Sequence, residues 1–363
     1  MILEQLQSKE RMQGLKEALR DRTAPAAEAL IEHKDNGDIQ CFACGHRCVV
    51  KPGRDGVCRV RFNDGGTLRV PWGYVGALAC DPIEKKPFFH LLPGRDALTF
   101  GMLGCDYHCG YCQNWVTSQM LRDPHAVAPA QSTTARRLAE LAIEYDAPVL
   151  ASSYNEPLIT SEWAVEVFTE ARQRGLRCAY ISNGNATPQA VDYLRPHVQA
   201  YKVDLKTFSD RNYRQLGGVL ENVTNTIRLL KQRDFWVEIV TLVVPGFSDD
   251  ADDLRRMADF LSSVDPLMPW HVTAFHPDYK MSEGYRRTSV EDLLKVIEYG
   301  RQAGLKYLYP GNLPGQVGEG ENTHCHHCGT TLVRRFGFTV LENRLEPGGV
   351  CPECHKTIPG IWE

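Results

Sequence analysis

The sequence predicts an α/β protein that contains a partial or full (β/α) barrel, with a Cys-rich metal-binding module before it and zinc-ribbon-like Cys knuckles after it. Three observations lead to this prediction. From about residue 97 short apolar segments alternate with helical segments, clustered cysteines flank this region, and polar residues gather where the apolar segments end. Repeated strand–helix units favour a parallel sheet covered by helices. A doubly wound open sheet is the alternative that this pattern leaves open.

The chain of 363 residues is long enough for about two domains, or for one large barrel with appendages. We predict an N-terminal helical region over residues 1–40, a Cys-rich metal-binding module over 41–96, a barrel over 97–318 and a zinc-ribbon-like module over 319–363. The first residues are charged and helix-forming, and they lack the apolar core of a secretory signal.

The composition favours a globular enzyme over a nucleic-acid-binding or membrane protein. The formal net charge is -4, and charged residues make up 24% of the chain, so no basic excess would attract nucleic acid. No apolar run approaches the roughly 18 residues of a membrane span. We therefore expect a cytoplasmic protein, in which clustered thiols favour metal binding over disulfides.

Seven apolar segments are predicted strands, and five segments between them are predicted helices. The strands are expected at residues 97–102, 148–154, 177–184, 200–206, 236–244, 270–275 and 305–311, and the helices at 135–145, 163–174, 222–233, 250–264 and 290–303. Polar motifs follow the strands, among them NEP, SNGN, DLK and FHPD. In a (β/α) barrel all these strand exits lie on one face, so we expect the active site there.

Cys105, Cys109 and Cys112 follow the first of these strands in the stretch GCDYHCGYCQN. Three thiolates can hold three irons of a [4Fe-4S] cluster and leave the fourth iron open, because each iron needs one external ligand. An open metal position is typical of a site that binds or transforms something. The alternatives are a reactive surface thiol cluster and a zinc site completed by His108, which is adjacent to Cys109 and so poorly placed for the same metal.

Two further groups of four cysteines flank the predicted barrel. The C-terminal group forms two C-x2-C knuckles with the spacing of a structural zinc ribbon, and a rubredoxin-type iron site is the alternative. The N-terminal group could bind zinc or an auxiliary [4Fe-4S] cluster, and we favour zinc because a structural role is expected. Cys178 is expected in the core, and Cys80 receives no role. The C-terminal group is Cys325, Cys328, Cys351 and Cys354, and the N-terminal group is Cys41, Cys44, Cys48 and Cys58.

The C-x3-C-x2-C spacing after a strand resembles the signature of the radical SAM superfamily. The resemblance implies a radical SAM type of barrel and a [4Fe-4S] cluster whose open iron is chelated by S-adenosylmethionine (SAM). It implies that one electron from the reduced cluster cleaves SAM to methionine and a 5'-deoxyadenosyl radical, which abstracts hydrogen from a substrate. It places Tyr111 near the adenine, and it implies a low-potential electron donor of flavodoxin or ferredoxin type.

The same resemblance extends to the other strand ends. YNEP resembles the Gly-Gly-Glu element that receives the SAM amino group, SNGN resembles the next strand end that contacts SAM, and DLK and FHPD match glycyl-radical-enzyme activases. The arginine that precedes VVPG in activases is absent here. The SAM contacts that the resemblance implies are Asn155, Glu156, Ser182, Asn183, Asp204, Lys206 and His276.

Further motifs, CFACGHRC, DPIEKKPFFHLLPG, YPGNLPG and the terminal GIWE, resemble one subgroup. This subgroup is the radical SAM member of the AmmeMemoRadiSam system, related to pyruvate formate-lyase activating enzymes. The resemblance implies two companion proteins, the Memo-like and AMMECR-like components, and leaves open whether the substrate is a glycine of a protein or a small molecule. The alternative function is a non-catalytic zinc-rich scaffold or binding module, which would contain zinc and neither iron nor sulfide.

Overall fold

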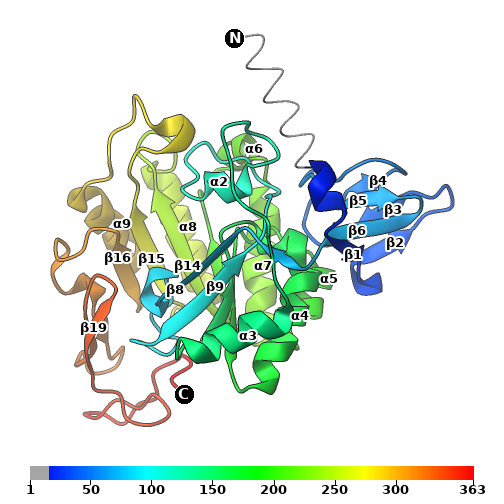
Figure 1. Cartoon of the computed structure of the whole chain (residues 1–363). Helices are drawn as coiled ribbons and strands as arrows, with labels where there is room; N and C mark the ends of the chain where they lie inside the picture. Colours follow the sequence, from blue (N-terminus) through cyan, green and yellow to red (C-terminus); the bar gives the residue numbers. More distant parts are fainter. Residues whose placement is uncertain (1–15) are drawn as a thin grey trace.

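An eight-stranded, mostly parallel sheet forms the centre of the protein (Figure 1). The computed structural model describes residues 16–363. Seven strands run parallel, and the eighth, β8, pairs antiparallel with β9 at one edge. In sheet order the strands are β16 (Leu308–Gly311), β15 (Trp270–Ala274), β14 (Trp236–Val243), β13 (Ala200–Asp204), β12 (Arg177–Ser182), β11 (Val149–Ser152), β9 (Asp96–Gly101) and β8 (Ala77–Pro82).

The seven strands predicted from the sequence are all present in this sheet, which confirms the α/β class. Among the described strands, β8 and β16 are the two edges and do not pair with each other. Residues of both edge strands nevertheless line one cavity, so the sheet curves into an incomplete barrel. The sheet begins at residue 77, ahead of the boundary predicted at residue 97, and the division of the chain into modules stays a prediction.

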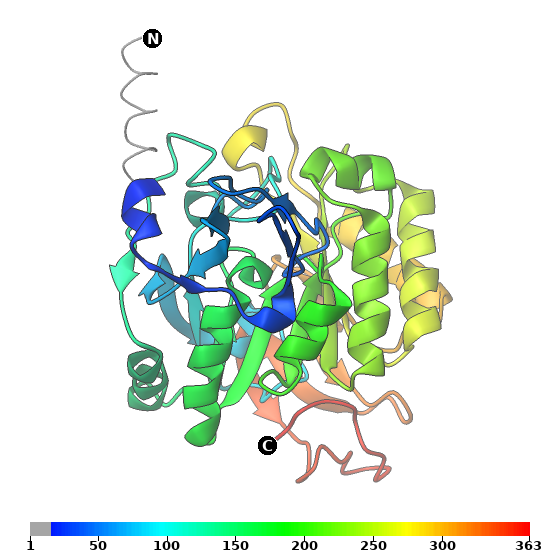
Figure 2. The ribbon, with the colours of Figure 1, turned by 90° about the vertical axis from the view of Figure 1, so that its right-hand side faces the viewer.

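Helices cover the outer face of the sheet (Figure 2). The five predicted helices are confirmed, whereas α5 and α6 were not predicted, because segments this short show little helical periodicity. Capping fixes several helix ends. In α9 the Ser289 hydroxyl accepts the Asp292 N–H and the Asp292 carboxylate accepts the Ser289 N–H. The helices are α3 (Ala135–Glu144), α4 (Ser161–Gln173), α5 (Pro188–Leu194), α6 (Asp210–Leu216), α7 (Leu220–Gln232), α8 (Ala251–Val264) and α9 (Val290–Gln302).

Small antiparallel sheets form the N-terminal module, and they correct the expectation of a helical region up to residue 40. Residues 16–20 are helical, but residues 23–41 contain strands and a 3₁₀ turn, and residues 1–15 lie outside the described part. Ile39 packs with Val50 and Val70 in a core of its own, so tertiary packing overrides local helix propensity. One sheet is β1 (Thr23–Pro25), β6 (Thr67–Pro71) and β5 (Phe62–Asp64), another is β2 (Ile31–His33), β3 (Ile39–Cys41) and β4 (Val49–Val50), and β7 (Tyr74–Val75) pairs with β10 (Gln131–Ser132).

A buried ion pair joins the N-terminal module to helix α4. The two terminal nitrogens of Arg61 donate to the two carboxylate oxygens of Glu162, each over 2.7 Å. The side chains of this pair are only 2% and 4% exposed. Nearby, the Gly45 N–H donates to the Asn185 carbonyl over 2.7 Å. The module is therefore held directly against the helices and loops of the barrel.

The segment over residues 83–92 covers the amino ends of the barrel strands. The Glu238 carboxylate on β14 accepts the N–H groups of Phe89 and His90, each over 2.9 Å. The same segment contacts the end of the chain, because the Leu92 N–H donates to the Ile361 carbonyl over 2.8 Å. The C-terminal module therefore lies at this end of the barrel (Figure 1), and its strands are β17 (Thr323–His324), β18 (Thr331–Phe336) and β19 (Thr339–Asn343).

Within residues 16–363, none of the helices is both long and apolar enough to cross a membrane. The cytoplasmic location stays a prediction.

Candidate active site

The three central cysteines lie in the loop between β9 and the short helix α2 (Trp115–Ser118), at the carboxyl end of the sheet. Cys109 is buried, and Cys105 and Cys112 are half-buried. The Cys105 sulfur accepts the Tyr107 N–H over 3.3 Å, and the Cys112 sulfur lies 3.2 Å from the Ser118 hydroxyl oxygen. The loop therefore orients two of the thiols through its own backbone and side chains.

These thiols line a cavity of about 580 Å³ at the strand ends. Pockets for small-molecule ligands usually span about 300–1,000 Å³. Seven of the eight residues predicted to contact SAM also line this cavity, and their individual contacts with SAM stay predictions. These residues are Tyr111, Asn155, Glu156, Ser182, Asn183, Asp204 and Lys206.

The spacing of the triad fits a cluster better than a single ion. Among the described residues, the three central thiols do not form a group whose sulfur atoms all lie within 4.8 Å of one another. Thiolates around one zinc ion lie about 3.8 Å apart, given a Zn–S bond of about 2.3 Å. A [4Fe-4S] cluster needs more room, because each thiolate binds a different iron. His108, the alternative zinc ligand, is exposed on the outside of the loop.

Glu156 joins the ends of two neighbouring strands. It follows β11, and its carboxylate accepts hydrogen bonds from the Ser182 hydroxyl and the Asn183 N–H at the end of β12, each over 2.7 Å. It also accepts the Leu158 N–H over 3.1 Å. Burial, and then the neighbouring Asp106 carboxylate, raise the pKa of Glu156 to about 8. The Glu156 carboxylate is thus held in place by three hydrogen bonds from the protein.

The backbone approaches closely beside Glu156. A Cβ on Gly101 would lie 2.3 Å from the Ser153 carbonyl oxygen, so this position requires glycine. Tyr154 stands where the superfamily element has a glycine, and it adopts a left-handed φ of 69°. Asn155 holds this arrangement, because its side-chain oxygen accepts the Met102 N–H over 3.0 Å. The Asn155 side chain therefore positions the loop after β11.

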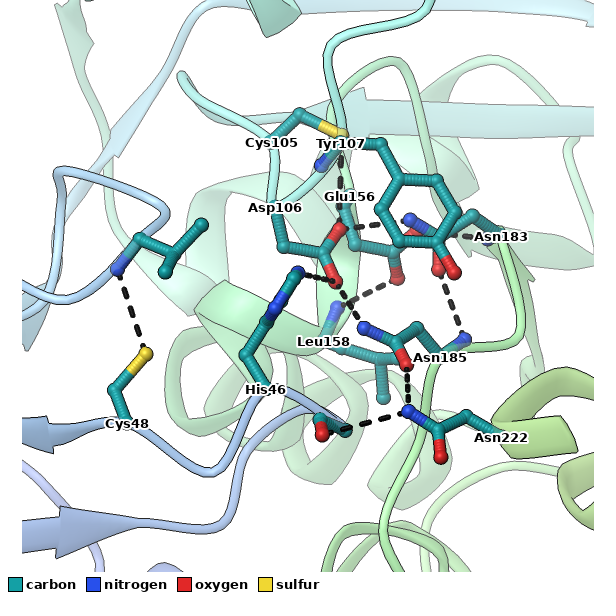
Figure 3. A network of polar contacts seen from close by, with 12 residues as sticks. His46, Cys48, Cys105, Asp106, Tyr107, Glu156, Leu158, Asn183, Asn185 and Asn222 are labelled. Atoms are coloured by element: carbon teal, nitrogen blue, oxygen red, sulfur yellow. Dashed lines mark hydrogen bonds and ion pairs between the residues drawn. The ribbon is translucent and has the colours of Figure 1, made fainter. Parts of the chain in front are cut away.

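Asp106, directly after Cys105, is the centre of a buried polar network (Figure 3). Its two carboxylate oxygens accept hydrogen bonds from the side-chain amides of Asn183, over 2.7 Å, and Asn185, over 2.9 Å. His46 of the N-terminal module points toward the same carboxylate, with Nε2 at 3.9 Å. The network therefore connects the loop of the triad, the end of β12 and the N-terminal module.

Asp204 lies between two lysines at the end of β13. The Lys206 ammonium donates to one carboxylate oxygen over 3.3 Å, and the Lys202 ammonium donates to the other. Burial acts to raise the pKa of Asp204, but the two lysines outweigh it and lower that pKa. Asp204 is therefore ionised at neutral pH, and both lysines line the cavity with it.

His276 is the one predicted SAM contact that does not line the cavity. It is exposed, and its Nε2 lies 3.0 Å from the Gln113 side-chain nitrogen, which belongs to a residue of the lining.

Sequence reasoning missed several residues of the cavity and of its support. Lys202 could have been found, because residues two apart on a strand point to the same face and Asp204 was already assigned. Lys86 and Tyr154 lie in the DPIEKK and YNEP motifs, and the Lys86 ammonium donates to the Tyr154 hydroxyl over 3.1 Å. Asp106 and His46 gave no signal, because their roles depend on contacts between distant segments.

The four C-terminal cysteines form the one compact group of potential metal ligands in the described part of the chain, with all sulfur atoms within 4.8 Å of one another. Cys325 and Cys354 lie 3.6 Å apart, and Cys328 and Cys351 lie 3.7 Å apart. These distances match the edges of a tetrahedral tetrathiolate site, about 3.8 Å. This group could hold a metal, and the choice of zinc stays a prediction.

Comparisons with known proteins identify the family of the chain. Residues 100–261 match the Radical SAM superfamily. The chain is 35% identical over 316 residues to the uncharacterized protein MJ0808 of Methanocaldococcus jannaschii, covering 86% of this chain and 92% of that protein. It is 26% identical over 247 residues to a Staphylococcus aureus pyruvate formate-lyase-activating enzyme, covering 62% and 93%. A solved radical SAM methyltransferase from Sphaerobacter thermophilus is similar with a TM-score of 0.48 and 14% identity, covering 80% of this chain and 78% of that chain.

Three free thiols line a cavity at the carboxyl ends of a mostly parallel sheet, and the family match indicates an enzyme. The chain belongs to the radical SAM superfamily, and it has relatives among the pyruvate formate-lyase-activating enzymes. Membership of the superfamily implies a [4Fe-4S] cluster and SAM as cofactors. It does not favour the alternative of a non-catalytic scaffold.

Proposed function

We propose that this enzyme cleaves SAM reductively at a cluster held by Cys105, Cys109 and Cys112 and removes a hydrogen atom from a substrate. The observation behind the proposal is the three-thiol loop, which lines a cavity together with the polar ends of the parallel strands. When bound, the cluster and SAM supply one electron and a 5'-deoxyadenosyl radical. The protein supplies the residues that position both groups in the cavity.

The lysines of the cavity are candidates for holding the SAM carboxylate. No arginine belongs to the lining among the described residues, whereas Lys202 and Lys206 both do. Burial acts to lower the pKa of Lys206, but the Asp204 carboxylate and the Cys109 thiolate outweigh it and raise that pKa. Lys206 therefore stays charged. Asp204 holds both ammonium groups at one strand end, where they can meet an anionic group of the ligand.

Tyr111 is the candidate contact for the adenine of SAM. The Tyr111 ring is buried, lines the cavity and packs edge-to-face against Phe247, with the ring centroids 5.7 Å apart. A ring held in this way offers its remaining surface to an aromatic base. We assign Tyr111 to the adenine on this basis, and His276 to the outer rim beyond Gln113.

The substrate class is drawn from the relatives. An activating enzyme of pyruvate formate-lyase is similar to this chain over 93% of its length. We therefore propose a residue of a partner protein as the first substrate to test, with the Memo-like and AMMECR-like proteins as the candidates and a flavodoxin or ferredoxin as the donor. These partners come from motif resemblance, and each can be tested separately.

The proposal is tested with anaerobically reconstituted protein, SAM and dithionite, by measuring 5'-deoxyadenosine. Wild-type protein should form it. Cys112→Ser should reduce its formation at least a hundredfold, and Cys80→Ser, a thiol on β8 outside the lining, is the matched control. Deuterium from a labelled partner protein should appear in 5'-deoxyadenosine. Equal product from wild-type and Cys112→Ser protein would exclude the proposal, and product without deuterium would exclude only that partner.

A further inference from the structure

The four N-terminal cysteines converge in one place. The Cys41 N–H donates to the Cys48 carbonyl over 2.9 Å, and the Val57 N–H donates to the Cys48 sulfur over 3.5 Å. These bonds bring the loop over residues 41–48 next to residues 57 and 58. The group is therefore a single site assembled from two segments.

This N-terminal group is wider than the C-terminal group. In the described part of the chain, only the C-terminal cysteines gather to within the 4.8 Å that one ion needs, and no three of the N-terminal thiols do so. The N-terminal group shares this wider spacing with the central triad. A cluster separates its thiolates because each binds a different iron, whereas one zinc ion draws four sulfurs to about 3.8 Å. The wider spacing favours the auxiliary cluster over the zinc ion that the sequence analysis preferred, and the metal of this group stays untested.

The N-terminal group also lies against the loop of the central triad. Gly104, directly before Cys105, has a φ of +95°, and a Cβ there would lie 2.9 Å from Val60 Cγ1 and 3.4 Å from the Cys58 carbonyl oxygen. On the other side, the Asp106 carboxylate faces His46, two residues after Cys44, at 3.9 Å (Figure 3). The two thiol groups are thus separated by backbone and one buried carboxylate.

The N-terminal thiols differ in exposure: those toward the triad loop are buried, and Cys48 on the other side is partly exposed. Cys44 and Cys58, which lie toward the triad loop, are buried. Cys48 is half-buried between Val49 and Val57, whose side chains are 53% and 48% exposed. Val49 and Val57 therefore offer a small apolar contact to a protein that approaches Cys48 from solvent. The site therefore has one face toward solvent and one face toward the triad.

We propose that Cys41, Cys44, Cys48 and Cys58 hold a second iron–sulfur cluster, and that this cluster passes electrons from a flavodoxin-type donor to the cluster on the triad. One electron leaves the reduced flavodoxin, which is thereby oxidised by one electron, and the N-terminal cluster is reduced by one electron. The same electron then reduces the triad cluster, and the N-terminal cluster returns to its oxidised state, so no atom or proton needs to move. The binding site stands on its own geometry, whereas the relay rests on the proposed SAM cleavage.

The binding site is tested by metal analysis and electron paramagnetic resonance of the full chain. Reconstituted wild-type protein should contain more iron and sulfide than the about four equivalents of one cluster. A triple variant with Cys105, Cys109 and Cys112 replaced by Ser should keep about two to four equivalents and a signal on reduction. Adding Cys44→Ser and Cys48→Ser should remove both. Zinc instead of iron in the triple variant, or one cluster's iron in the wild type, would overturn the proposal.

The relay is tested by the choice of reductant. In Cys44→Ser/Cys48→Ser protein, the ratio of 5'-deoxyadenosine formed with reduced flavodoxin to that formed with dithionite should fall at least tenfold below the wild-type ratio. Dithionite is small and can reach the triad without the N-terminal cluster. An unchanged ratio would exclude the relay. Absence of product from wild-type protein with both reductants would exclude the proposed function, while the iron content of the triple variant would still decide the site.

Discussion

The Asp106 carboxylate accepts a hydrogen bond from the Asn183 amide over 2.7 Å, and this bond joins the cluster loop after β9 to the end of β12, two strands away in the sheet. Both side chains are buried, and Asp106 is 1% exposed. The second Asp106 oxygen is used in the same way by Asn185. One carboxylate thus fixes the loop that bears Cys105 relative to the polar strand end.

Asp106→Asn should lower the free energy of unfolding by about 2–3 kcal/mol. The substitution replaces one of the two carboxylate oxygens by an NH2 group, so that one of the buried Asn183 and Asn185 amides faces a donor instead of an acceptor. Urea unfolding of the reconstituted protein measures this difference. Asp64→Asn, an exposed carboxylate on β5, is the control and should leave the urea midpoint unchanged. Equal midpoints for Asp106→Asn and wild-type protein would show that the network does not hold the loop.

The contribution of Glu156 to the stability of the protein should fall as the pH rises from 6.5 to 8.5. Glu156 has a pKa of about 8 in the folded protein and an ordinary value of 4.5 when unfolded, so the folded state binds the extra proton. Its contribution is complete below about pH 4.5 and is lost as the pH passes 8, by about 2 kcal/mol over this window. His90, whose pKa burial lowers to about 4, acts in the opposite direction only below about pH 6.5.

Glu156→Gln should therefore flatten this pH dependence, because glutamine does not titrate. The measurement is the free energy of unfolding in urea at several pH values between 6.5 and 8.5, and the slopes of the two proteins are compared rather than their levels. Parallel slopes would mean that Glu156 keeps an ordinary pKa in the folded protein.

Arg61→Ala should lower the free energy of unfolding by about 3–5 kcal/mol, because it leaves the Glu162 carboxylate buried without a partner. Arg137→Ala is the matched control, since Arg137 makes the same two-pronged contact with Glu144 on the exposed face of α3. The control should not change the urea midpoint. Similar effects of the two substitutions would contradict a role for burial in docking the N-terminal module.

Cys351→Ser should remove the metal of the C-terminal group and lower the thermal midpoint by about 5 °C or more, since a structural metal stabilises the fold that binds it. The iron of the central cluster should stay, because the C-terminal module contacts the opposite end of the barrel. Metal analysis and thermal unfolding of Cys351→Ser and Cys80→Ser protein, side by side, measure both effects. Loss of iron in parallel with the C-terminal metal would contradict this separation.

The sequence predicted the elements whose signal is local. The seven parallel strands and five long helices follow from repeated apolar segments, and the triad follows from its spacing and its place after a strand. Residues 23–40 were wrongly expected to be helical, because their strands depend on packing against Val50 and Val70. Local propensity does not contain that information.

In the candidate site, too, the residues with a local sequence signal were predicted and those that depend on distant contacts were not. Residues in motifs at strand ends were found, and seven of the eight predicted SAM contacts line the cavity. Asp106, His46 and Arg61 were not found, because each acts across a long sequence separation, for example from residue 61 to residue 162. The spacing of the N-terminal thiols is likewise a property of the folded chain.

The two edge strands β8 and β16 border the same cavity without pairing, whereas every other neighbouring pair in the sheet is joined by a ladder of hydrogen bonds. Moving β14 away from β15 would break such a ladder, but moving β16 away from β8 breaks none within the described strands. Phe338, between β18 and β19, also lines the cavity. The seam between β8 and β16 is therefore held by side chains and loops rather than by backbone hydrogen bonds.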